Sequence, residues 1–100
     1  MKKNVNRTRP KTPLDWYTLT ETTNSVLNEL IAYTGRERIA ELQKETPDQN
    51  RIDALWAYFK EINAINRNVE NFKDARRMEE IIAKYAPVLK KMYTENVYPI

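Results

Sequence analysis

The sequence contains no cysteine and no histidine, and it has a single glycine in 100 residues. Without cysteine the chain can form neither disulfides nor thiolate metal sites. Without histidine it lacks the commonest general base and the commonest ligand of transition metals. A single glycine excludes the glycine-rich phosphate loops of nucleotide-binding proteins. We therefore expect a protein that is not an enzyme, needs no cofactor or metal, and has no small-molecule substrate.

Long apolar segments are also absent. No run approaches the ~20 residues of a membrane-spanning helix, and the basic N-terminus leads into TPLDWYTLTETT instead of the apolar region of a secretory signal. We therefore expect a cytoplasmic protein that does not contact membranes. Strand patterns are missing too, because no turn dipeptide joins two β-branched runs. This leaves an all-α fold.

Positive charge is concentrated at the N-terminus. The net charge is +3, but residues 1–11 alone hold five cations and no acid, which leaves −2 for the rest. The five cations are Lys2, Lys3, Arg7, Arg9 and Lys11. We expect residues 1–11 to form a flexible basic arm and residues 12–100 to form a single helical domain. Such an arm could contact nucleic acid or an acidic partner, or it could be a disordered solubilising leader.

Helix-start signals occur three times. Thr12 precedes Pro13, Thr46 precedes Pro47, and Thr34 precedes the segment 35–37. Threonine caps helices and proline suits the first helical position. We therefore expect a first helix that starts at Pro13 or near Thr20 and ends at Gly35, a short helix over residues 36–44, and another helix capped by Thr46.

Three apolar stripes of helical period predict the core. The first helix carries Leu19, Thr23, Val26, Leu30 and Tyr33, and the two strongest stripes follow it. They are Ile52, Leu55, Trp56, Phe59 and Ile62, and then Met78, Ile82, Tyr85, Leu89 and Met92. The asparagine-rich segment 66–71 predicts a break between them, and the alternative is one helix of about forty residues. Pro87 should kink the last helix or restart it. The fold predicted is a small bundle of three to four helices.

A helix-turn-helix is one candidate for DNA binding. Residues 36–44 and the helix from Pro47 would be its two helices, with Gln49, Asn50 and Arg51 at the start of the recognition helix. Acidic neighbours oppose contact with phosphates. The alternative is an ordinary helix start whose polar residues face water.

Aromatic and acidic residues off the main stripes are further candidates. Trp16 and Tyr17 could stack on bases, fill a pocket of a partner, or fold back on the first helix. Tyr58 lies off its stripe and is a candidate for a subunit contact. Glu79 and Glu80 lie among cations at helical spacing, which favours a solvated, salt-bridged face over an acid–base or Mg²⁺ site.

Together these features indicate a small, non-enzymatic binding or regulatory protein that self-associates. Its arm would contact nucleic acid or an acidic partner. The alternative is a pure protein–protein interaction module, such as an inhibitor, an immunity-type bundle or an assembly component, which works through helix faces. Ten asparagines with frequent lysine and isoleucine are typical of AT-rich coding sequences, such as those of many phages and mobile elements.

Overall fold

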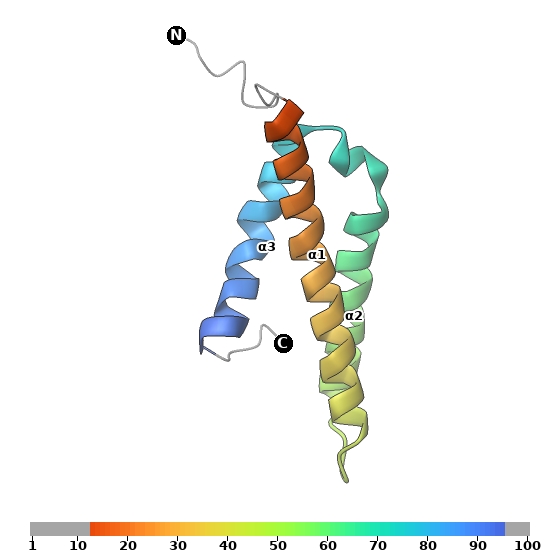
Figure 1. Ribbon diagram of the computed structural model, residues 1–100. Coiled ribbons are helices and arrows are strands. Elements are labelled where there is room, and N and C mark those ends of the chain that lie inside the picture. The colour runs from red at the N-terminus through yellow and green to blue at the C-terminus, as the bar shows by residue number, and fades with distance from the viewer. Residues whose placement is uncertain (1–12, 96–100) are drawn as a thin grey trace.

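The computed structural model describes residues 13–95, and over this range the chain is almost entirely helical. The elements are α1 (Pro13–Leu42), α2 (Gln49–Arg67), the 3-10 helix η2 (Val69–Phe72) and α3 (Ala75–Glu95). Figure 1 shows them as a small bundle without a sheet. The predicted all-α bundle of three to four helices is confirmed for the described part of the chain.

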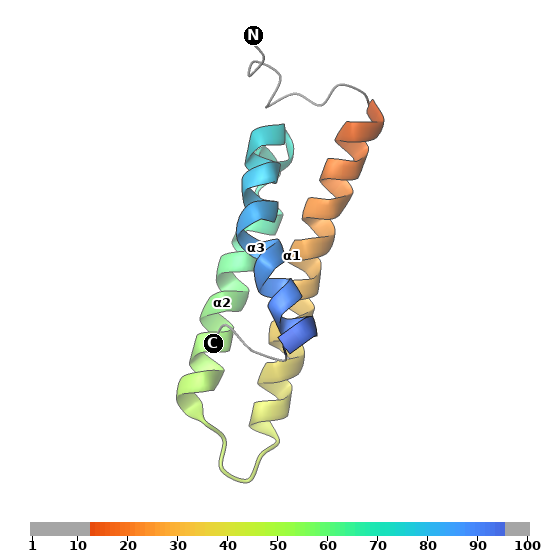
Figure 2. The same cartoon turned by 90° about the vertical axis from the view of Figure 1, so that its left-hand side faces the viewer.

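The three α-helices extend over different lengths of the bundle. α1 and α2 run antiparallel as a hairpin, and α3 packs along the half of this hairpin that holds the start of α1 and the end of α2 (Figures 1 and 2). Among the described residues, only α1 and α2 continue beyond the end of α3, down to the loop of residues 43–48. The third layer of the bundle therefore stops before the hairpin does.

The predicted stripes supply most of the core. The fully buried aliphatic side chains come from all three helices: Leu27 and Leu30 from α1, Leu55 and Ile62 from α2, and Met78 from α3. Tyr85 and Met92 are also buried, as the last of the three stripes predicts. Burial of such side chains stabilises the fold by roughly 1.5–3 kcal/mol each. The periodicity in the sequence therefore identifies the faces that meet.

The placement of Trp56 in the core was wrong, because its side chain is 41% exposed. α3 packs against the side of α2 that carries Glu61, which accepts a hydrogen bond from the Tyr85 hydroxyl, and half-buried Tyr58. Tyr58 is two positions from Trp56, which turns the two side chains by about 200° around the helix. Trp56 therefore lies on the face of the hairpin that α3 does not cover.

α1 does not end at Gly35, so the expected short helix over residues 36–44 is not a separate element. The buried stripe of α1 continues across the glycine from Thr34 to Glu41, and Glu41 contacts Arg51 of α2. Thr34 does not cap a helix, since its hydroxyl donates to the carbonyl oxygen of Ile31 at 2.8 Å. Packing against α2 outweighs the weak helix propensity of one glycine, which costs up to about 1 kcal/mol.

α2 begins at Gln49, and Asp48 is its cap in place of the expected Thr46. The Asp48 carboxylate accepts hydrogen bonds from the backbone N–H groups of Asn50 (3.0 Å) and Arg51 (3.3 Å). The N–H of Asp48 itself donates to the Glu41 carboxylate at 2.9 Å. This bond to α1 holds Asp48 in the extended conformation that a cap requires, so Thr46 remains in the loop.

The predicted break between the last two stripes is confirmed, and the alternative of one long helix is excluded. α2 ends at Arg67, and the Asn68 side chain accepts from the N–H of Glu70 at 3.1 Å to start η2. The Asn71 amide then donates to the carbonyl oxygen of Ile65 at 2.9 Å. α3 contains Pro87 and continues to Glu95, so the expected restart at the proline does not occur.

Candidate functional site

The five cations of the predicted arm lie outside the described residues, which begin at position 13. Their contact with nucleic acid or an acidic partner stays a prediction. The site residues that the structure does describe are distributed over α1 and α2. They can be compared one by one with what the sequence predicts of them.

The predicted start of a recognition helix is occupied by contacts within the chain. The Gln49 amide donates to the Asp53 carboxylate at 2.9 Å. Arg51 lies 3.1 Å from a carboxylate oxygen of Glu37 and 3.5 Å from one of Glu41. The separate first helix of a helix-turn-helix is absent, because residues 36–42 belong to the long helix α1. Base reading by Gln49, Asn50 and Arg51 would therefore require a geometry other than the expected motif.

The three predicted interface aromatics are in different environments. Trp16 is half-buried in the first turn of α1, and neighbouring Tyr17 is 61% exposed. Tyr58 is half-buried against the core, and this burial, together with the nearby Glu61 carboxylate, raises its pKa above the usual range. Tyr58 therefore contributes to the packing of α2 against α3, whereas Tyr17 stays accessible.

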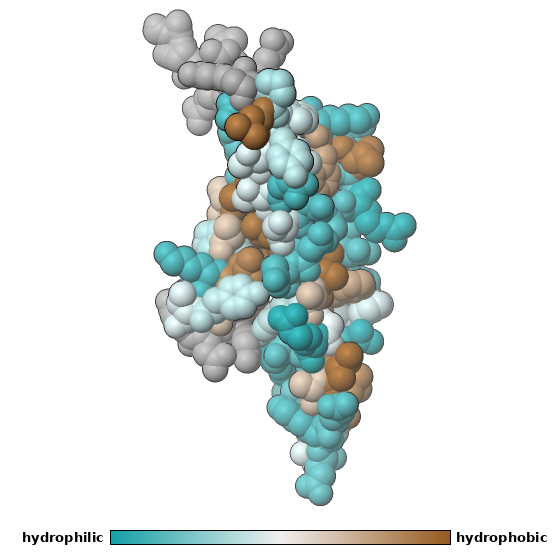
Figure 3. Space-filling model, viewed as in Figure 1, coloured by the Kyte–Doolittle hydropathy of each residue, from teal (hydrophilic) through white to brown (hydrophobic). Residues whose placement is uncertain are grey.

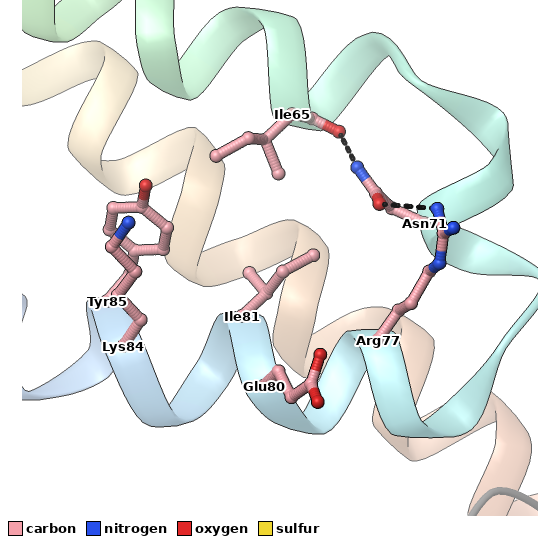
Figure 4. A pocket seen from close by; sticks show the side chains of 7 residues that line it. All are labelled: Ile65, Asn71, Arg77, Glu80, Ile81, Lys84 and Tyr85. Atoms are coloured by element: carbon pink, nitrogen blue, oxygen red, sulfur yellow. Dashed lines mark hydrogen bonds between the residues drawn. The ribbon is translucent and has the colours of Figure 1, made fainter.

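An open pocket of about 300 Å³ lies between the end of α2, η2 and α3 (Figure 4). It is lined by Ile65, Asn71, Arg77, Glu80, Ile81, Lys84 and Tyr85. Its polar groups are engaged within the chain: the Asn71 oxygen accepts from Arg77 at 3.5 Å, and Glu80 pairs with Arg76. The Tyr85 hydroxyl donates to Glu61, and burial followed by this bond raises its pKa above the usual range. The bond from Tyr85 to Glu61 fastens α3 to α2, and the bond from Arg77 to Asn71 fastens α3 to η2.

A cluster of charges closes the hairpin at its loop. The Glu41 side chain is almost fully buried and lies 3.0 Å from the Lys44 ammonium and 3.5 Å from the Arg51 guanidinium. The hydrogen bond from the N–H of Asp48, with help from Lys44, lowers the pKa of Glu41 below its ordinary value. The carboxylate therefore stays ionised and joins α1, the loop and α2.

A partly exposed aromatic cluster of the described chain surrounds Trp56. Its indole ring is stacked on Phe59, with ring centroids 5.1 Å apart and an interplanar angle of 18°. The Arg38 guanidinium carbon of α1 lies 4.5 Å from the indole centroid, and the Lys60 ammonium lies 5.7 Å from it. Both distances are typical of cation–π contacts.

α1 also carries two exposed aliphatic side chains that are close to Arg38 in the sequence. Ile39, which is 58% exposed, follows Arg38, and Leu42, which is 53% exposed, lies one turn further on. We call the group of Arg38, Ile39, Leu42, Trp56, Phe59 and Lys60 the Trp56 surface. Figure 3 shows hydrophobic side chains over this end of α1 and α2, bordered by hydrophilic ones. The Trp56 surface lies partly on the section of the hairpin that extends beyond the end of α3 and partly on the adjoining section.

The two cations of the Trp56 surface have no acidic partner among residues 13–95. The described ion pairs involve Lys44, Arg51, Lys73 and Arg76, and none includes Arg38 or Lys60. The Nε atom of Arg38 is buried and has no hydrogen-bond partner in the described chain. Contact with the indole therefore takes the place of a carboxylate for both groups.

The sequence contained a signal for this surface. With Trp56 and Phe59 included, the apolar stripe of α2 is wider than the face that one neighbouring helix can cover. The positions of Arg38 and Lys60 beside the indole could not be read from the sequence, because they depend on the antiparallel register of α1 and α2.

Comparisons with protein-family models, with curated proteins and with solved structures give no match. Among the described helices, none combines the length and the apolar content that crossing a membrane requires. Within residues 13–95, no three acidic side chains converge as a metal site would need.

Proposed function

We propose that this protein is a small, non-enzymatic binding protein that acts by docking a macromolecular partner on the α1–α2 hairpin. The observation that carries the proposal is the Trp56 surface, where a tryptophan that is 41% exposed contacts Arg38 of α1, the helix that also carries the exposed side chains of Ile39 and Leu42. Exposed tryptophans next to arginines are typical of the residues that dominate binding energy in protein interfaces. The favoured mode is thus protein–protein contact through helix faces.

Packing within the described chain supports this proposal. The hairpin continues beyond the end of α3, so its outer part is a pair of helices without a third layer. No described element covers the apolar side chains on this outer part of the hairpin. A partner on this surface would bury them without any change in the bundle.

Photo-crosslinking tests the proposal. A photoreactive amino acid replaces exposed Leu42 on the Trp56 surface, and in a control protein it replaces exposed Lys91 on α3. In an extract of the cells that encode the protein, we expect a discrete covalent adduct from position 42 that is absent from position 91 and is lost with Trp56→Ala. Equal adducts at both positions, or an adduct that Trp56→Ala does not change, would contradict the proposal.

A second candidate is contact with nucleic acid through residues 1–11. The observation that favours it is the charge distribution, since these residues hold five cations and the rest of the chain is net acidic. Contacts of this kind are electrostatic and depend strongly on salt. The two functions are compatible, because the arm and the Trp56 surface are separate in sequence.

A further inference from the structure

We infer that the partner recognised by the Trp56 surface is an acidic amphipathic helix of another protein. This inference rests on the proposed function and specifies the chemistry of the partner. It follows from three properties of the surface. Its two cations have no acidic partner among the described residues, its indole ring already contacts Phe59 and Arg38, and its face is formed by two helices.

The charge of the surface favours an acidic partner. Arg38 on α1 and Lys60 on α2 both contact the indole of Trp56, and neither has a carboxylate partner among the described residues. Asp53 lies one turn before Trp56, but its carboxylate accepts a hydrogen bond from the Gln49 amide. Carboxylates of a partner would thus meet two unpaired cations, one from each helix.

The state of the indole ring favours a protein partner over an unpaired base. A base binds tryptophan by stacking on the face of the ring. In this structure Phe59 is stacked on the indole and the Arg38 guanidinium is 4.5 Å from its centroid. A base would have to displace one of these groups, whereas aliphatic side chains can pack against the exposed part of the side chain and leave both groups in place.

The shape of the surface favours a helix. α1 and α2 lie side by side and antiparallel, so a helix placed between them would contact both. Its apolar stripe would cover Leu42 and Trp56, and acidic side chains beside the stripe would reach Arg38 and Lys60. This is helix-in-groove recognition, in which apolar residues anchor the helix and charges at the rim select the partner.

The test compares two labelled model peptides that differ only in charge. Both are amphipathic helices of about five turns, or 18 residues, with the same leucine stripe, flanked by glutamates in one and by lysines in the other. Fluorescence anisotropy with the full-length protein measures their affinities. We expect the glutamate peptide to bind at least tenfold more tightly and to weaken as salt is raised.

Variants locate the binding. The double variant Arg38→Gln/Lys60→Gln should abolish the preference for the glutamate peptide, and Trp56→Ala should weaken its binding at least tenfold. The matched control, Lys90→Gln/Lys91→Gln, removes the same charge from exposed positions of α3 and should leave the affinity unchanged. Circular dichroism and the Tm verify that each variant is folded.

Several outcomes would overturn the inference. They are equal binding of the two peptides, no binding of either, and a preference that survives Arg38→Gln/Lys60→Gln. A single-stranded oligonucleotide that competes at Trp56, or a dimer in sedimentation that Trp56→Ala dissociates, would replace the acidic helix by nucleic acid or by a second copy of this chain. If the crosslink from position 42 persists in any of these cases, the proposed function stands and only the identity of the partner fails.

Discussion

Gly35 lies in the interior of α1, and a Cβ atom added there would meet nothing within 4 Å. Glycine in a helix is less stable than alanine because it loses more backbone entropy on folding. We therefore expect Gly35→Ala to raise the free energy of unfolding by about 0.5–1 kcal/mol, as measured by urea denaturation. The reverse change at a nearby exposed position of the same helix, Ala32→Gly, should lower it by a similar amount. Destabilisation by Gly35→Ala would mean that α1 is not a continuous helix at this point.

Glu41 makes stability depend on pH at the hairpin loop. Its pKa is lowered by the bond from the Asp48 N–H and by Lys44, so its contribution is present above the ordinary carboxyl pKa and is lost as the pH falls through the lower pKa of the folded state. Glu41→Gln should therefore lower the Tm at neutral pH, and the difference from the unmodified protein should shrink in acid. Glu45→Gln, a change at an exposed carboxylate of the same loop, should show no such trend. A constant difference across the titration would contradict the role of the ionised carboxylate.

The start of α2 offers a test at the scale of one element, because two neighbouring residues compete as its cap. Asp48 accepts two backbone hydrogen bonds from the first turn, whereas Thr46 lies two residues earlier in the loop. Asp48→Ala should cost about 1 kcal/mol of stability, and Thr46→Ala should cost much less. Thermal denaturation of the two variants decides between the caps. A larger loss of stability with Thr46→Ala would mean that Thr46 is the cap, as the sequence alone predicts.

Element boundaries show where sequence reasoning succeeds and where it fails. The break at residues 66–71 was predictable because asparagines both end a helix and start the next, as Asn68 does here. The cap at Asp48 was not, because it depends on a hydrogen bond to Glu41, seven residues earlier in the chain. The continuation of α1 through Gly35 likewise has a long-range cause, since packing against α2 keeps the chain helical there. Local signals thus predict an end only where no tertiary contact overrides them.

At the scale of the whole molecule, the fold was predictable, whereas the width of the α2 stripe was the only signal for the candidate site. The stripes of α2 and α3 identify which faces are buried, and most of their residues lie in the core. A stripe does not tell on which side of a hairpin the third helix packs, or how far along it reaches. Trp56 is exposed for the first of these reasons, because α3 packs on the side of α2 that carries Tyr58 and Glu61. The positions of Arg38 and Lys60 beside the indole depend in the same way on the register of α1 against α2.

The division of charge between the N-terminal segment and the rest of the chain gives the last prediction. Removing residues 1–11 changes the net charge from +3 to −2. If this segment contacts nucleic acid, the full chain should bind duplex or single-stranded oligonucleotides with an affinity that falls steeply with salt, and the shortened chain should not bind. Because each neutralised phosphate contributes a slope of about −0.9 on duplex DNA, five cations allow a slope no steeper than about −4.5.

The helical content and the stability of the shortened chain are the control for this truncation. Since the described fold begins at Pro13, the shortened chain should keep the circular dichroism and the Tm of the full chain. It should also keep its affinity for the glutamate peptide, because Arg38, Trp56 and Lys60 are untouched. Equal oligonucleotide binding by both chains would assign nucleic-acid contact to the helical body. That body is net negative, so such binding would have to use a local cluster of cations, and loss of binding in Arg38→Gln/Lys60→Gln would then identify the Trp56 surface as the cluster.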